Sequence, residues 1–109
     1  MVTFNKTAQQ GDVLISAATN FPSSGEKVKE KRNMHVIAEG ETTGHLHGIP
    51  VEDGVDVCVL EGTVYMQNDH PVTLSHDEHH PVEIPQGIWQ FDIVNEYDHF
   101  MEESKKVAD

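Results

Sequence analysis

Short runs in which apolar and polar residues alternate recur along the chain, and clusters of Gly, Pro, Asn and Asp separate them. Alternation of this kind, rich in β-branched residues, is typical of half-buried β-strands. It predicts strands over residues 12–17, 34–39, 42–47, 55–60, 63–67, 72–75, 82–84 and 88–94. Since no segment shows a long apolar period of about 3.6 residues, the pattern predicts an all-β fold, a small antiparallel barrel or sandwich.

The connections between these strands carry turn and loop signals. Glu61-Gly62 is predicted to join two strands as a hairpin. Pro85-Gln86-Gly87 is predicted to form a tight turn, because Pro presets a negative φ and Gly accepts a positive one. Residues 20–32 are predicted to be a surface loop and residues 96–109 a polar tail. With 109 residues, the whole chain, 1–109, fits a single domain.

The formal net charge of −12 disfavours binding partners that are themselves negatively charged. So acidic a chain would be repelled by nucleic acid and by anionic membrane surfaces. Four of its seven cations lie between Lys27 and Arg32, where a solvated loop is the favoured interpretation. Cys58 is the single cysteine, so no internal disulfide is expected. The sequence shows neither a signal peptide nor an apolar run of membrane-spanning length, which predicts a cytoplasmic protein.

Four of the eight histidines form two close pairs. Gly44-His45-Leu46-His47-Gly48 places two imidazoles two residues apart, and on a strand such residues face the same way. His76-Asp77-Glu78-His79 places two more at i and i+3, which share a face at a turn or helical corner. Four neutral imidazoles, or three with a carboxylate, suit Zn, Fe, Mn, Ni or Cu. The pairs therefore predict one divalent metal site formed by His45, His47, His76 and His79.

Other residues are candidates for catalysis or for the wall of a pocket. Glu78 and Glu41 are candidate general bases, and Gln90, Trp89 and Tyr97 are candidates for shaping the pocket. Three of these have structural alternatives: Glu41 in a turn, Glu78 orienting a ligating imidazole, and Trp89 packed in the core. The remaining histidines are interpreted as structural, turn or tail residues: His35, His70, His80 and His99.

The order of features from residue 39 to residue 95 resembles the cupin family. The first cupin motif has His-x-His followed by a Glu, and His45, His47 and Glu52 fill these positions. The second has a Pro-x-Gly turn followed by a histidine, where this chain has Pro85-Gln86-Gly87 and then Gln90. The resemblance implies a double-stranded β-helix that holds a metal ion through the His-x-His pair and Glu52. Gln90 takes the place of the last cupin ligand, and the His76–His79 corner would compensate for it.

A closer resemblance is to small bacterial and phage proteins of uncharacterised role. They share Gln-Gly-Asp-Val near the start, Gly-Glu-x-Thr-Gly-His-x-His in the middle, and His-Asp-Glu-His before Ile-Pro-x-Gly. This chain carries those motifs at residues 10–13, 40–47, 76–79 and 84–87. The resemblance covers most of the chain and implies no function.

Two hypotheses about function stay open. The first is a metal-dependent protein that acts on a small molecule at the mouth of the barrel, with Zn, Fe, Mn or Ni as cofactor. The second is a non-catalytic accessory or structural protein, such as a phage-encoded module, with a structural metal or none. A coordination position open to water or substrate would favour the first, and a closed shell of protein ligands the second. A homo-oligomer is compatible with both, and the sequence leaves enzymatic activity undecided.

Overall fold

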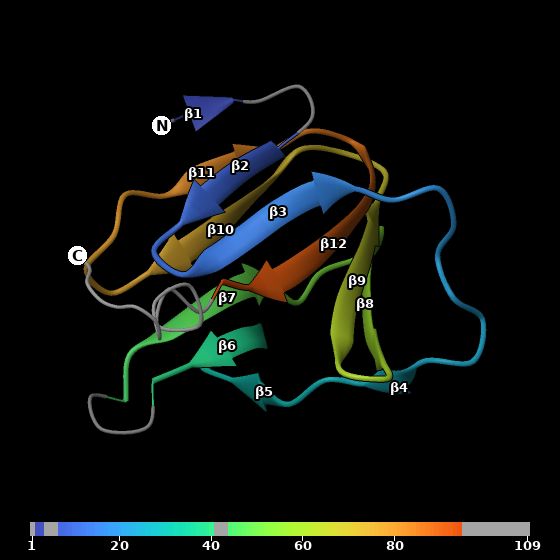
Figure 1. The fold of residues 1–109 in the computed structure, drawn as a ribbon, viewed down its shortest axis with the longest axis horizontal. Helices are drawn as coiled ribbons and strands as arrows, with labels where there is room; N and C mark the ends of the chain where they lie inside the picture. Colours follow the sequence, from blue (N-terminus) through green and yellow to red (C-terminus); the bar gives the residue numbers. More distant parts are fainter. Residues whose placement is uncertain (1, 4–6, 41–43, 95–109) are drawn as a thin grey trace, which may run out of the picture.

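The computed structural model describes residues 2–3, 7–40 and 44–94, in which every regular element is a β-strand (Figure 1). Two six-stranded sheets form, with the orders β1-β11-β10-β7-β6-β5 and β2-β3-β12-β9-β8-β4. All neighbouring strands pair antiparallel except β1 and β11, which pair parallel. The predicted all-β fold is therefore confirmed, and the two sheets fit the sandwich of the two predicted forms. Nowhere in the described ranges is there a helix with the length and apolar character needed to cross a membrane.

The chain passes between the two sheets in runs of consecutive strands, so that β2–β4, β8–β9 and β12 belong to one sheet and β1, β5–β7 and β10–β11 to the other. In chain order they are β1 Val2–Thr3, β2 Thr7–Gln10, β3 Val13–Ala17, β4 Glu26–Lys27, β5 Glu30–Lys31, β6 Met34–Glu39, β7 Leu46–Pro50, β8 Val55–Leu60, β9 Thr63–Asn68, β10 Val72–His76, β11 Val82–Ile84 and β12 Gly87–Ile93. The predicted hairpin of β8 and β9 is confirmed. Glu61 and Gly62 at its tip both have positive φ, 51° and 85°, as a two-residue turn between twisted strands requires.

Alternate residues of the strands point into the space between the sheets and form one core. Both sheets contribute to it: Val13, Ile15, Ile37, Ile49, Val55, Val57, Met66, Val72, Leu74, Val82, Ile84, Trp89 and Phe91. Removal of this apolar surface from water is the main favourable contribution to folding. In five of the strands these residues are spaced i, i+2, which explains why the sequence pattern predicted most strands correctly.

The predicted strand over residues 42–47 is wrong at Gly44 and His45, which belong to no strand, and residues 42 and 43 lie outside the described residues. The strand β7 begins only at Leu46 and continues to Pro50, so Gly48 lies inside it and does not interrupt it. A Cβ atom at Gly48 would lie 2.8 Å from the Met34 sulfur. The glycine therefore serves the close packing of β7 against β6, a reason that is not visible in the sequence. Gly44, with a φ of 74°, bends the backbone just before β7.

The segment 20–32 is largely exposed, as predicted, but it is not wholly irregular. It contains β4, which pairs with β8 in one sheet, and β5, which pairs with β6 in the other. Both strands are two residues long, charged and at a sheet edge, which discourages pairing with other chains. The predicted polar tail lies outside the described residues.

Candidate functional site

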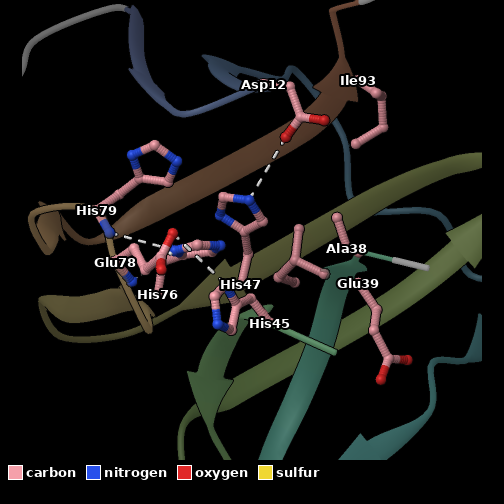
Figure 2. Close-up of a pocket in the computed structure, with 11 residues that line it drawn as sticks. Asp12, Ala38, Glu39, His45, His47, His76, Glu78, His79 and Ile93 are labelled. Carbon is pink, nitrogen blue, oxygen red and sulfur yellow. Dashed lines mark hydrogen bonds and ion pairs between the residues drawn. The ribbon is translucent and has the colours of Figure 1, made fainter. Parts of the chain in front are cut away.

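A pocket of about 670 Å³ opens where the turn between β2 and β3 faces the corner between β10 and β11 (Figure 2). Residues of both sheets line it: Asp12, Ile37, Ala38, Glu39, Gly40, His45, His47, His76, Glu78, His79 and Ile93. All four histidines that the sequence singled out are among them. The two pairs, well separated along the chain, thus meet in one place.

Strand register explains how the histidines meet. In the first sheet, His47 on β7 is the direct partner of His76 at the end of β10 and of Ala38 on β6. Directly opposite residues on neighbouring strands place their side chains on the same face. The ring centroids of His47 and His76 are 4.3 Å apart, and His79, at the corner, lies 4.5 Å from His76. His45, just before β7, lies 5.8 Å from His76.

His47 is the most enclosed of the four, with 4% of its surface exposed. Its Nδ1 atom lies 2.8 Å from Oε1 of Gln10, a buried hydrogen bond between the two sheets. Its Nε2 atom faces the pocket, 3.5 Å from Oδ1 of Asp12. Burial, together with the neighbouring His76, lowers the pKa of His47 to about 4. The ring is therefore neutral at neutral pH, the state in which imidazole can accept a metal ion.

His76 is held differently, because its Nδ1 atom accepts two backbone hydrogen bonds. The amides of Glu78 and His79 donate to it at 2.9 and 3.2 Å and so form the turn at the corner. In the neutral ring the proton must then be on Nε2. Burial and the neighbouring imidazoles of His79 and His45 lower the pKa of His76, which favours this neutral form. His76 thus offers the pocket an N–H donor in this arrangement, whereas a ligating nitrogen would need the ring to turn.

Three carboxylates line the pocket, and they differ in their availability. Asp12 is 62% exposed and Glu78 70% exposed, and the latter lies 3.6 Å from Nδ1 of His45. Glu39 instead accepts hydrogen bonds from Lys29 and Lys31, which lower its pKa. Asp12 and Glu78 are therefore the carboxylates open to a ligand.

Part of the pocket wall is apolar. Ile37 and Ala38 of β6 lie there, together with Ile93, which is 57% exposed. Ile93 is the one large hydrophobic side chain that the described residues leave exposed. A ligand in the pocket would therefore meet imidazoles, carboxylates and aliphatic carbon.

Several residues that the sequence suggested for the site lie elsewhere. Trp89 is packed in the core and donates a hydrogen bond to the Pro85 carbonyl. Gln90 donates to Asp92 on the same strand, and Glu52 is paired with His70 at a distance of 2.6 Å. None of the three lines the pocket. Glu41, Tyr97 and His99 lie outside the described residues.

The side chains form no ready-made coordination shell. Among the residues that the structure describes, no group of three or more His, Cys, Asp or Glu side chains is arranged to hold a metal ion. The donor types fit one nevertheless, since imidazole with carboxylate suits Zn and similar ions. The side chains that would have to turn are the accessible ones, His45 at 32% exposure and the exposed His79.

Comparison with known proteins places the chain in a family. A family model described as a domain of unknown function, DUF8820, matches residues 9–93. The chain belongs to this family. No curated protein and no solved structure matches it. The DUF8820 match contains every residue that lines the pocket, from Asp12 to Ile93. The resemblance to cupins stays a prediction.

Two residues of the DUF8820 segment that contact His47 were not among the predicted site residues, namely Gln10 and Asp12. Both lie at the tight turn between β2 and β3, in the motif Gln10-Gly11-Asp12-Val13. Gly11, with a φ of 58°, supplies the conformation that this two-residue turn needs. The sequence shows an acidic residue, Asp12, directly after a turn glycine. This pattern does not indicate that the turn contacts histidines of the other sheet.

Proposed function

We propose that the pocket binds one divalent transition-metal ion (Zn, Fe, Mn or Ni). Nε2 of His47 and the carboxylate of Asp12 are its central ligands. His45 and His79 turn inward to complete the site, and Glu78 is an alternative oxygen donor. The pocket leaves space beside the ion for a small molecule. Catalysis is not part of the proposal.

The separation of 3.5 Å between Nε2 of His47 and Oδ1 of Asp12 carries this proposal. Zinc binds imidazole nitrogen and carboxylate oxygen at about 2.1 Å, so two ligands of one tetrahedral ion lie about 3.4 Å apart. The separation is longer than a good hydrogen bond between nitrogen and oxygen, for which about 2.9 Å is usual. An ion bridging the two atoms would need little movement of the buried imidazole.

The surroundings of this pair also support a ligand site. A bound ion would polarise a water molecule or a carbonyl group placed next to it. His76, with its proton on Nε2, is positioned to donate a hydrogen bond into the pocket. The aliphatic side chains of Ile37 and Ile93 would contact an apolar part of the molecule. We therefore expect a small ligand that carries both polar and apolar groups.

Metal titration of the purified protein tests the proposal. After treatment with a chelator and its removal, calorimetry with Zn²⁺, Ni²⁺, Mn²⁺ and Fe²⁺ should show one ion per chain. His47→Ala and Asp12→Asn should each weaken binding more than about 100-fold, because residues that merely orient a ligand are worth about 10- to 100-fold. His70→Gln, which removes a histidine outside the pocket, is the matched control. Absence of binding, or equal losses in all three variants, would contradict the proposal.

A further inference from the structure

The hydrogen bonds of Gln10 determine which way its amide group faces. This side chain is buried, with 2% of the residue exposed, at the end of β2. Its Nε2 atom donates to two backbone carbonyls, those of Leu74 at 2.9 Å and His80 at 2.8 Å. Carbonyl oxygens can only accept hydrogen bonds, so the NH₂ group must face them. Oε1 of Gln10 is thereby directed at His47.

This orientation fixes the proton on His47. Oε1 of Gln10 can only accept, and it lies 2.8 Å from Nδ1 of His47, so Nδ1 must carry a proton. A neutral imidazole has one N–H, and Nε2 is then left with a lone pair that faces Asp12. Without Gln10 the opposite tautomer would be favoured, since the Asp12 carboxylate attracts a proton to Nε2.

We propose that Gln10 is a positioning residue that holds His47 in the Nδ1–H tautomer and so keeps Nε2 available to a metal ion. The functional consequence rests on the metal site proposed above, whereas the tautomer is a property of the metal-free chain. Gln10 also links the site to its support. The two carbonyls that it binds lie on either side of the corner that carries His76 and His79. The Gln10 side chain thus orients the buried imidazole of His47 and anchors the segment that carries His76 and His79.

Nitrogen-15 NMR of the metal-free protein in chelator tests the tautomer directly. In the wild-type chain at pH 7.5, Nδ1 of His47 should have the chemical shift of a protonated nitrogen and Nε2 that of an unprotonated one. Because the hydrogen bond is buried, the Nδ1 proton should exchange slowly with water. The reverse assignment, with the proton on Nε2, would overturn the inference. The wild-type spectrum alone can give this answer, even if every Gln10 variant fails to fold.

Two variants test the role of Gln10. Gln10→Leu has a similar size but no acceptor, and it should shift His47 toward the Nε2–H tautomer and weaken Zn²⁺ binding about 10- to 100-fold. Gln10→Glu keeps an acceptor and should retain the Nδ1–H tautomer. Gln67→Leu changes an exposed glutamine on β9, outside the pocket, and should alter neither readout. An unchanged tautomer in folded Gln10→Leu would refute the positioning role. If the tautomer behaves as expected but Zn²⁺ does not bind, the proposed function is wrong and the tautomer inference stands.

Discussion

His47 and His76 are directly opposite each other on β7 and β10, with their ring centroids 4.3 Å apart. The two imidazole rings carry their protons on different nitrogen atoms. The Nδ1 atom of His47 is bonded to a side-chain amide, and the Nδ1 atom of His76 accepts from the backbone. The first imidazole therefore offers a lone pair to the pocket and the second an N–H group. Two histidines that look equivalent in the sequence thus have different roles.

Metal should stabilise the protein in a pH-dependent way. At a free ion concentration of about 100 times Kd, binding adds about 2.7 kcal/mol to the free energy of unfolding. For a domain of this size that corresponds to a rise in Tm of roughly 10 °C. Protons compete with the ion for imidazole nitrogens, so the rise should be largest near pH 7.5, shrink as pH falls, and be lost as pH passes the His47 pKa of about 4. Thermal unfolding with Zn²⁺ and with excess chelator at several pH values measures this difference. Curves that coincide at every pH would be incompatible with the proposed site.

Gly11→Ala should disturb the pocket more than the fold. A Cβ atom at Gly11 would lie 2.7 Å from Nε2 of His79 and 3.4 Å from Cε1 of His47. The exposed His79 must move away, and metal binding should weaken severalfold. The positive φ adds a cost in stability of about 1–2 kcal/mol for any residue with a side chain.

Gly62→Ala is the matched control for this change. Gly62 also has a positive φ, 85°, but a Cβ atom there would meet nothing within 4 Å. Both variants should lose similar stability in urea unfolding, and Gly11→Ala alone should lose metal affinity. Equal affinities for Zn²⁺ in the two variants would show that His79 does not contribute.

His70 should stabilise the fold more at acidic than at alkaline pH. Its hydrogen bonds to Glu52 and Asp69, both 2.6 Å long, raise its pKa above the usual value of about 6.5. The protonated ring is thus favoured in the folded state, and its contribution is present below pH 6.5 and lost as pH rises through the raised pKa. Urea unfolding of wild type and His70→Gln should differ at pH 5.5 and converge at pH 9. A difference that grew with pH would contradict the assignment.

Leu74→Ala should test the core beneath the pocket. Leu74 on β10 is fully buried, and truncation of such a side chain costs about 2–5 kcal/mol because a cavity is left. Ile93→Ala removes a comparable side chain from the exposed rim and should change stability by about 0.5 kcal/mol or less. Urea unfolding at pH 7.5 provides both values. Similar losses in the two variants would mean that the core does not depend on β10 in this way.

The alternation of apolar and polar residues was enough to predict most strands and the all-β class. It placed β6 and β11 at their observed bounds and identified the hairpin of β8 and β9. Successive side chains of a strand point to opposite faces, so burial of one face produces an alternation that is visible in adjacent residues. It failed at β7, where the reason for Gly48 is a side chain on another strand. The two histidine pairs were likewise visible in the sequence, since each is local.

The partners of those histidines were decided only by the tertiary structure. Trp89 and Gln90 were expected near the pocket, but the first is packed in the core and the second bonds to its own strand. Gln10 and Asp12 were not expected there, yet they contact His47. Gln10 and Leu74, which share a hydrogen bond, are 64 positions apart in the chain. Local patterns specify which face of a strand is buried, whereas the order and register of strands from two sheets decide which polar groups meet at their edge.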